Sequence, residues 1–255
     1  MIKWYIAMAL ISYLIGSVSF SVIFTKRFAG FDVRERGSKN AGSTNVLRTA
    51  GPVPAILTLV CDLLKGVGAV LLGLLLGNML GSLGADACPD GSKAILCEVA
   101  AVFAMVGHTF PIFFKFKGGK GVATGIGALL VLNWEVGLIC LIFGLVLIAL
   151  TRMVSVGSMA GAILFPIICI FIRENFIVND NFFSYIIFGT IIAIIILFNH
   201  RANIRRLKMG QENILSFKHK NEPTGAYSTT PTEAALKREE AAAAQEAASE
   251  ETENK

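Results

Sequence analysis

The chain has 255 residues, of which 54% are hydrophobic and 16% are charged, whereas soluble domains average about 25% charged residues. Its mean hydropathy of +0.65, together with several apolar stretches close to the roughly 20 residues that cross a bilayer, excludes an ordinary soluble domain. The net charge of +5 does not predict a nucleic-acid partner, because the basic residues lie in loops between apolar segments and not on one face of a soluble fold.

The hydrophobic pattern predicts an all-α polytopic membrane bundle of about seven transmembrane helices in residues 1–217. The first apolar run is too long for a cleaved signal and is interpreted as a span. The run at 122–150 exceeds one upright helix, and Asn133, Trp134 and Glu135 interrupt it, so we divide it into a short fourth span and a fifth. One long tilted helix, which gives six spans, is the alternative. The expected spans lie near residues 4–24, 52–80, 94–114, twice within 122–150, 156–172 and 182–198.

Charged residues within the second span need an explanation, because a charge inside the bilayer is costly unless it is paired or faces the bundle interior. Asp62 and Lys65 lie three residues apart on one helical face. They are interpreted either as a structural ion pair or as support for a functional site.

The cysteines and the C-terminal tail predict no cofactor chemistry. No Cys-x-x-Cys spacing is present, and Cys88 and Cys97 would pair only if their loop faced an oxidising compartment. No metal or other cofactor is expected. Residues 218–255 are rich in Ala, Glu and Thr and are predicted to form a disordered, low-complexity cytoplasmic tail.

Loop charge predicts the orientation of the bundle. In a seven-span path, loops 25–51, 115–121 and 151–155 and the segment after residue 198 share one side and carry most of the Lys and Arg residues. The other side holds Lys3, Lys93 and Arg173 among Asp86, Asp90, Glu135, Glu174 and Asp180. The positive-inside rule therefore places the N-terminus outside and the C-terminus in the cytoplasm.

Two polar loops on the predicted cytoplasmic side suit phosphate. The first reads GSKNAGSTNVLR at 37–48 and combines glycines, hydroxyls, amides and an arginine. The second reads KGGKG at 117–121 and leads into a helix expected to start near Val122, where lysine and free backbone N–H groups bind anions. Glycine follows Lys120, so this is not a Walker A loop. A flexible polar loop and ordinary interfacial lysines are the respective alternatives.

Two histidines lie near the same membrane face. His108 is near the end of the third span, and His200 follows the seventh, with Asn203 three residues further on the same helical face. Both can be structural, and without nearby acidic ligands they are a poor metal site. The loops and histidines together predict one phosphate-binding site at the cytoplasmic surface of the membrane.

The three regions resemble the motifs of the bacterial acyl-phosphate:glycerol-3-phosphate acyltransferases, which are integral membrane enzymes. The resemblance covers about residues 4–215. Asp62, Lys65, Gly66 and Ser155 also fit. The matching positions are Gly37, Ser38, Asn40, Gly42, Thr44, Asn45 and Arg48; Gly107, His108, Pro111 and 116–124; and His200, Asn203, Ile204, Arg206 and Glu212.

The resemblance implies transfer of a fatty acyl group from acyl phosphate to the position-1 hydroxyl of glycerol-3-phosphate, giving lysophosphatidic acid and phosphate in the first acylation of phospholipid biosynthesis. It implies a multi-pass protein of the bacterial inner membrane, functionally linked to the soluble enzyme that makes acyl phosphate; we expect a monomer. The implied catalytic residues are His200, Asn203, Ser38 and Lys120. The implied substrate-binding residues are Ser38, Asn40, Thr44, Asn45, Arg48, His108, Lys117, Gly119, Lys120, Gly121, Ser155, His200 and Asn203.

The acceptor of the hydroxyl proton is left open between His200, His108 and the phosphate of the substrate. Acyl phosphate is already activated, so we favour the substrate-assisted route, with His200 as a positioning residue.

A transporter of a small phosphate ester is the alternative function. It is disfavoured because transporters place their sites near the bilayer midplane, commonly within inverted repeats. The His-x-x-x-x-Asp motif of other glycerolipid acyltransferases is absent, because Phe113 lies five residues after His108.

Overall fold

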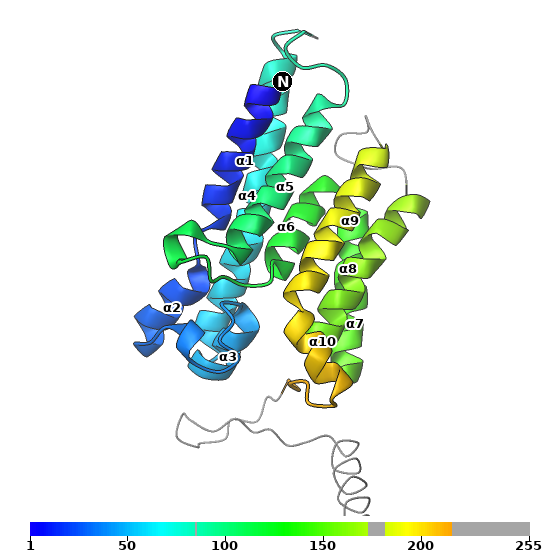
Figure 1. The fold of residues 1–255 in the computed structure, drawn as a ribbon. Helices are drawn as coiled ribbons and strands as arrows, with labels where there is room; N and C mark the ends of the chain where they lie inside the picture. The colour runs from blue at the N-terminus through cyan, green and yellow to red at the C-terminus, as the bar shows by residue number, and fades with distance from the viewer. Residues whose placement is uncertain (85, 173–181, 216–255) are drawn as a thin grey trace, which may run out of the picture.

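The computed structural model describes residues 1–84, 86–172 and 182–215, and this part of the chain is helical, which confirms the predicted all-α class. Helix α1 packs on α5, α5 on α4, and α4 on α6, while α7, α8 and α9 form the other side of the bundle (Figure 1). The elements are α1 (Ile2–Gly16), α2 (Phe20–Ala29), η1 (Val33–Glu35), α3 (Ser43–Ala50), α4 (Pro52–Gly81), α5 (Ser92–Thr109), η2 (Ile112–Phe114), α6 (Val122–Leu132), α7 (Trp134–Thr151), α8 (Val154–Phe171), α9 (Phe182–Asn199) and α10 (Arg201–Lys208).

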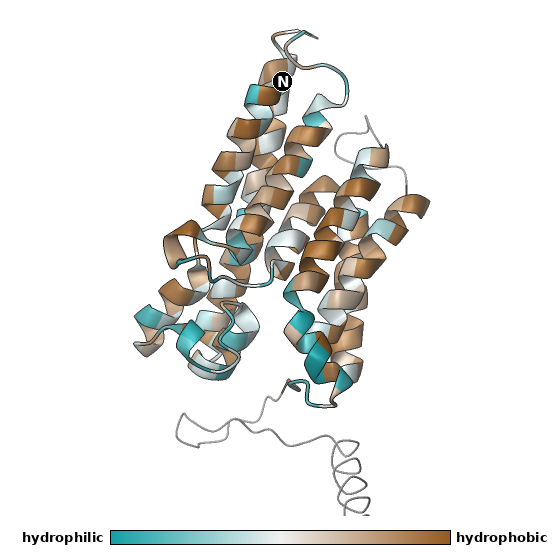
Figure 2. Ribbon diagram, in the orientation of Figure 1, coloured by the Kyte–Doolittle hydropathy of each residue, from teal (hydrophilic) through white to brown (hydrophobic). Residues whose placement is uncertain are grey.

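Apolar residues cover the middle of the bundle, and hydrophilic residues gather toward its ends (Figure 2). Within the described residues, five helices are long and apolar enough to cross a membrane. A sixth is added if α9 and α10, bent by 59° at their junction, are one span. The structure thus confirms a polytopic helix bundle, with five or six helices of spanning length instead of the expected seven. The expected pass that falls short is the fourth, α6, whose 11 residues are fewer than a bilayer requires.

The predicted division of the apolar run at 122–150 is confirmed. Helix α6 ends at Leu132, and α7 begins at Trp134. The side-chain oxygen of Asn133 accepts a hydrogen bond of 2.9 Å from the backbone N–H of Val136. A side-chain acceptor at this position satisfies one of the unpaired donors at a helix start. Asn133 therefore ends one helix and begins the next.

The first predicted span is interrupted, which the sequence pattern did not show. Helix α1 ends at Gly16 and α2 begins at Phe20. The Nζ atom of Lys65 donates a hydrogen bond of 3.1 Å to the carbonyl of Val18 in the break, and it lies 2.8 Å from the Oδ1 atom of Asp62. The ion pair expected in α4 is therefore present. It also satisfies a backbone carbonyl that an unbroken helix would have paired internally.

Two further boundaries differ from the prediction. The third span was expected to reach residue 114, but α5 ends at Thr109. Phe110 precedes Pro111, and a proline disfavours the helical conformation of the residue before it. The loop expected at 25–51 contains the end of α2, η1 and the whole of α3. Cys88 and Cys97 are free thiols. The loop expected at 173–181 and the tail predicted at 218–255 lie outside the described residues.

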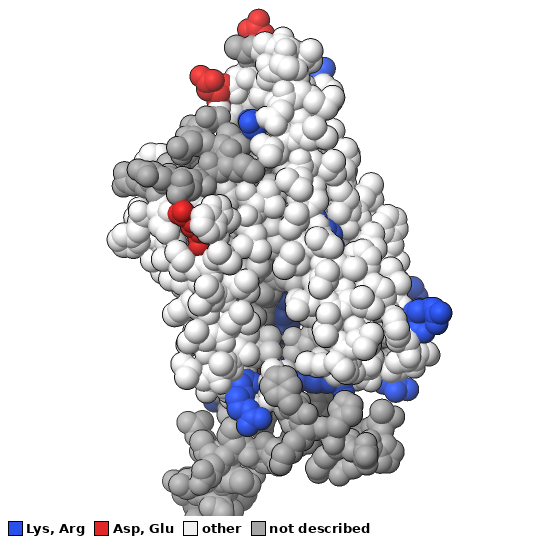
Figure 3. Space-filling view, turned by 180° about the vertical axis from the view of Figure 1, so that it is seen from behind, with Lys and Arg blue, Asp and Glu red and all other residues white. Residues whose placement is uncertain are grey.

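The two ends of the bundle differ in charge. On the face shown in Figure 3, most visible Lys and Arg side chains lie toward the end that carries α2, α3 and α10, and the Asp and Glu side chains lie toward the opposite end. The loops that the sequence groups on one side are therefore gathered at one end of the folded chain. The candidate site is built at this basic end.

Candidate active site

A buried carboxylate joins two helices, α8 and α10, at the basic end of the bundle. Glu212 follows α10 and is 7% exposed. Its Oε1 atom accepts hydrogen bonds from Ser155 Oγ at 3.0 Å and from Asn203 Nδ2 at 2.7 Å, and its Oε2 atom accepts one from Arg206 Nε at 3.0 Å. Because its amide nitrogen is held by Glu212, the Asn203 side chain has a fixed orientation in which its oxygen faces the loop before α6.

Lys120, at the end of that loop, reaches the same cluster. Its ammonium group donates a hydrogen bond to Asn203 Oδ1, which uses one of its three donors. Burial and the positive charges of Arg206 and Arg48 lower the pKa of Lys120 to about 8, although the carboxylate of Glu212 opposes this shift. A partly buried cation among hydrogen-bonding groups is suited to hold a phosphate or a developing negative charge.

His200 lies at the bend between α9 and α10 and is 2% exposed. Its Nδ1 atom is 2.8 Å from the carbonyl oxygen of Ile196. A carbonyl only accepts hydrogen bonds, so Nδ1 carries the hydrogen, and Nε2 is the ring nitrogen that can accept a proton or a hydrogen bond. The adjacent Asn199 donates to Thr109 Oγ1 at 3.2 Å, which ties this bend to the end of α5.

Asn45 organises the first polar loop from within. The side chain is 2% exposed. Its oxygen accepts a hydrogen bond of 2.9 Å from the backbone N–H of Ser38, and its amide nitrogen lies within 3.1 Å of the carbonyls of Val33, Arg36 and Asn40. These contacts engage both ends of the side-chain amide. Asn45 therefore holds the backbone that presents Ser38, instead of reaching out of the loop itself.

His108 lies behind the second loop. Its Nδ1 atom is 3.5 Å from Asp62 Oδ1, and Asp62 is paired with Lys65, so the three side chains form one buried polar cluster. The backbone of Gly119 lies close to the ring, since a side-chain carbon on Gly119 would collide with His108 Nε2. The histidine thus supports the loop that leads to Lys120.

This close approach predicts that Gly119→Ala is strongly damaging. The added carbon would meet the buried ring of His108, and it would lie 3.0 Å from the backbone oxygen of Ala41, so the loop must move. We expect turnover per folded molecule to fall roughly 10- to 100-fold, because small displacements of catalytic groups have effects of this size. Gly68→Ala in α4 is the control, since a carbon there meets nothing within 4 Å. Equal turnover of the two variants would contradict the predicted contact.

The structure brings some of the predicted site residues together and sets others apart. Lys120, Ser155 and Asn203 meet through Glu212, and the charge of Arg48 acts on Lys120. Glu212 was matched to the third motif but was assigned no role, and the motif match was the signal that could have found it. Among the described residues, no group of three His, Cys, Asp or Glu side chains could hold a metal ion. Ser38, Asn40 and Thr44 are half-buried, Arg48 and Lys117 are exposed, and Gly121 precedes α6 with a φ of +85°.

An apolar cavity of about 90 Å³ lies between α6, α7, α8 and α9. Its lining includes Val122, Gly157 and Ile196 at one end and Leu129 and Phe165 further along the helices. Val122 lies two residues after Lys120, and Gly157 lies two residues after Ser155. Ile196 is one helical turn before His200. The basic, hydrogen-bonded cluster and an apolar cavity therefore adjoin one another.

The glycerol-3-phosphate acyltransferase family matches residues 6–210, which is most of the chain. The chain belongs to the glycerol-3-phosphate acyltransferase family. The family member of Clostridioides difficile is 40% identical over 208 residues, covering 82% of this chain and 94% of the relative, and that of Shouchella clausii is 40% identical over 219 residues, covering 86% and 100%.

Two solved structures have the same fold. The crystal structure of PlsY (YgiH), an integral membrane glycerol 3-phosphate acyltransferase, is 29% identical in its glycerol 3-phosphate form, with a TM-score of 0.69, and it covers 83% of this chain and 96% of that chain. Its lysophosphatidic acid form is 28% identical, with a TM-score of 0.67. These matches confirm the family that the three motifs resemble. They also agree with the interpretation of this chain as an integral membrane acyltransferase.

Proposed function

We propose that this protein transfers a fatty acyl group from acyl phosphate to the position-1 hydroxyl of glycerol-3-phosphate. The products are lysophosphatidic acid and inorganic phosphate, and the reaction is the first acylation of phospholipid biosynthesis. The observation that carries the proposal is the junction of the Lys120 cluster with the apolar cavity. Such a junction suits a reaction that joins a phosphorylated, water-soluble acceptor to an apolar chain.

The polar residues have two roles in binding the phosphate groups, and the apolar cavity binds the acyl chain. Arg48 and Lys120 compensate the negative charge, and Ser38, Ser155 and Asn203 orient the substrates by hydrogen bonds. The apolar chain of the donor enters the cavity beyond Val122 and Gly157. The family name and the glycerol 3-phosphate and lysophosphatidic acid forms of PlsY support this choice of acceptor and product. Asn45 and His108 support the loops and do not bind the substrates directly, since the side chain of each is engaged within the protein.

The acceptor hydroxyl attacks the carbonyl carbon of acyl phosphate, forming the ester C–O bond. The bond from that carbon to the phosphate oxygen breaks, and phosphate leaves with the bonding electron pair. Negative charge develops on the carbonyl oxygen, where Lys120 and the N–H groups of the glycine-rich loop stabilise it. The hydroxyl proton goes to the departing phosphate, which is a sufficient base at neutral pH.

His200 then positions the substrate and does not carry the proton. His200→Gln keeps a hydrogen-bonding side chain at this bend but cannot be protonated near neutral pH. We expect the variant to retain turnover within a few fold of the wild type, with the change mainly in KM. A loss of turnover approaching the roughly 100- to 10,000-fold contribution of a general base would instead assign proton transfer to His200.

The charge separation supports a protein with its N-terminus outside, its C-terminus in the cytoplasm and its site on the cytoplasmic side of the bacterial inner membrane. This path has seven passes, of which the one through α6 is short. Glycerol-3-phosphate then reaches the site directly from the cytoplasm. Acyl phosphate arrives from the soluble enzyme that makes it, and the protein acts as a monomer.

The identity of the donor tests the proposal. Purified protein in detergent is supplied with glycerol-3-phosphate and with palmitoyl phosphate, palmitoyl-CoA or palmitoyl-acyl carrier protein, and lysophosphatidic acid is measured for each. We expect product from palmitoyl phosphate alone, with one phosphate released for each lysophosphatidic acid. Product from either thioester at a comparable rate would replace acyl phosphate as the donor, and no product from any donor would refute the acyltransferase assignment.

A further inference from the structure

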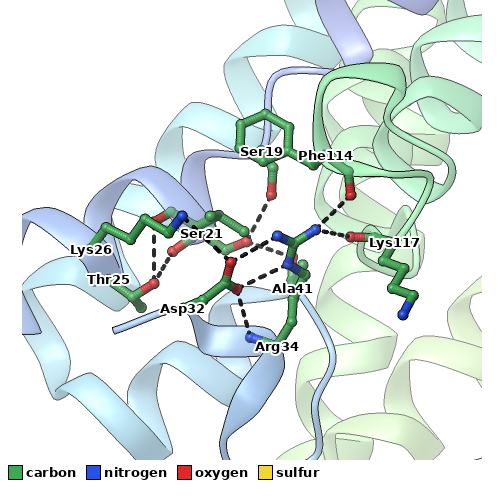
Figure 4. A network of polar contacts seen from close by, with 10 residues as sticks. Ser19, Ser21, Thr25, Lys26, Asp32, Arg34, Ala41, Phe114 and Lys117 are labelled. Carbon is green, nitrogen blue, oxygen red and sulfur yellow. Dashed lines mark hydrogen bonds and ion pairs between the residues drawn. The ribbon is translucent and has the colours of Figure 1, made fainter. Parts of the chain in front are cut away.

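Asp32 and Arg34 form a bidentate pair next to the candidate site but outside its reacting groups. Arg34 Nε donates to Asp32 Oδ1 at 2.9 Å, and Arg34 Nη2 donates to Oδ2 at 2.7 Å (Figure 4). The side chains are only 10% and 19% exposed. The pair lowers the pKa of the Asp32 carboxyl and raises that of Arg34, chiefly through this hydrogen bonding. Two parallel hydrogen bonds fix the plane of the guanidinium group.

The remaining edge of the guanidinium points at the loop that leads to Lys120. Its Nη1 atom donates to the carbonyl of Phe114 at 2.6 Å and lies 3.5 Å from the carbonyl of Lys117 (Figure 4). Between these carbonyls, Lys115 and Phe116 have φ values of +58° and +57°. Side chains other than glycine disfavour this left-handed region, so two successive residues held there indicate a turn that surrounding contacts must maintain.

The same turn is tied to the first polar loop. The backbone N–H of Ala41 donates to the carbonyl of Gly118 at 3.4 Å, and the carbonyl of Ala41 accepts a hydrogen bond of 2.9 Å from Ser21 Oγ (Figure 4). Gly118 lies two residues before Lys120, whose position must therefore follow that of the turn. Arg34 thus connects the segment after α2 to the backbone that carries the lysine.

We propose that Arg34, held by Asp32, is a positioning residue that keeps the turn at 114–117 in its left-handed form and thereby directs Lys120 toward Asn203. The inference rests on the proposed function, in which Lys120 binds phosphate. Among the described residues, Arg34 contacts Asp32, the ring of Phe114 and the two backbone carbonyls of the turn, so it acts through Lys120 and not on the substrate. Releasing the turn would expose Lys120 and weaken the effect of burial and of the charges of Glu212, Arg206 and Arg48 on its pKa.

Arg34→Lys and Arg34→Ala test the inference. Lysine keeps a positive charge beside Asp32 but lacks the planar fork that contacts both the carboxylate and the two carbonyls. We expect kcat/KM per folded molecule to fall roughly 10- to 100-fold in both variants. Lys26→Ala is the matched control, because Lys26 is 61% exposed and lies 3.8 Å from the same carboxylate without a contact to the turn. This variant should behave as the wild type.

A second readout needs no substrate. The rate at which acetic anhydride modifies Lys120, followed by mass spectrometry across a pH series, gives the pKa of its amine in each full-length protein. We expect that pKa to rise from about 8 toward the ordinary value in the Arg34 variants. An unchanged Lys120 titration with a lowered Tm would overturn the inference by showing a purely structural pair. If Arg34→Ala does not fold, Arg34→Lys decides. A wild type that makes no lysophosphatidic acid defeats the proposed function but leaves this titration readable.

Discussion

Glu212→Ala is expected to lose activity almost completely and to lower the Tm. The carboxylate accepts hydrogen bonds from Ser155, Asn203 and Arg206. Each buried donor left without a partner costs about 1–3 kcal/mol, and Ser155 and Asn203 are both 5% exposed. Arg206 is less affected because water reaches it. Without Glu212, the Asn203 amide loses the contact that aims its oxygen at Lys120, so we expect kcat/KM at least roughly 100-fold below that of the wild type.

Glu212→Gln separates geometry from charge. The remaining carbonyl oxygen can still accept from Ser155 and Asn203, but the new NH₂ group would face the donor of Arg206. We expect intermediate activity and a Tm between those of the wild type and the alanine variant. Thermal unfolding in detergent and lysophosphatidic acid formation provide the two measurements. Full activity of folded Glu212→Ala would contradict the role of Glu212 in organising the site.

Lys120→Ala is expected to reduce kcat/KM roughly 100- to 1,000-fold, because it removes a fixed cation from a partly buried site. Its effect on the Tm should be smaller than that of Glu212→Ala, because it takes the lysine donor from one buried acceptor, Asn203 Oδ1, whereas Glu212→Ala removes the acceptor of three donors. Lys208→Ala, which removes an exposed cation at the end of α10, is the control for net charge. Comparable activities of the two lysine variants would refute a direct role for Lys120.

The pH dependence follows from the pKa of about 8 that burial gives Lys120. The amine is charged below its pKa, so wild-type kcat/KM, which reports the free enzyme, should fall as pH rises through about 8. Bound phosphate stabilises the charged form and raises the pKa. The decline in kcat should therefore lie at higher pH. An alkaline limb of kcat/KM that is the same in Lys120→Ala would assign this titration to another group.

The sequence predicted features with strong local causes. Asn133 interrupts an apolar run and can cap a helix, and it does both. The glycine before Val122 marks the start of α6, where Gly121 has a φ of +85°. Asp62 and Lys65 had to be paired or to face the bundle interior, because the bilayer penalises isolated charges, and they lie 2.8 Å apart.

Features that depend on distant contacts could not be predicted. The break after Gly16 is apolar on both sides, and its stabilising donor, Lys65, is 47 residues from Val18. The α3 helix is polar and short, so it has no hydrophobic period of bilayer length. Glu212 is 57 residues from Ser155, and no local pattern shows that one carboxylate joins α8 to α10. His108 and Asn45 matched the motifs, but their contacts within the loops, with Asp62 and with the backbone of Ser38, join distant residues or depend on the loop fold.

One assay in proteoliposomes distinguishes acyl transfer from transport of glycerol-3-phosphate. Proteoliposomes containing the purified protein receive labelled glycerol-3-phosphate outside, with or without palmitoyl phosphate, and label is measured in the lipid extract and in the lumen. We expect lipid-extractable lysophosphatidic acid that requires palmitoyl phosphate, with no accumulation of glycerol-3-phosphate in the lumen. Intact glycerol-3-phosphate entering the lumen without palmitoyl phosphate, and no labelled lipid, would contradict it.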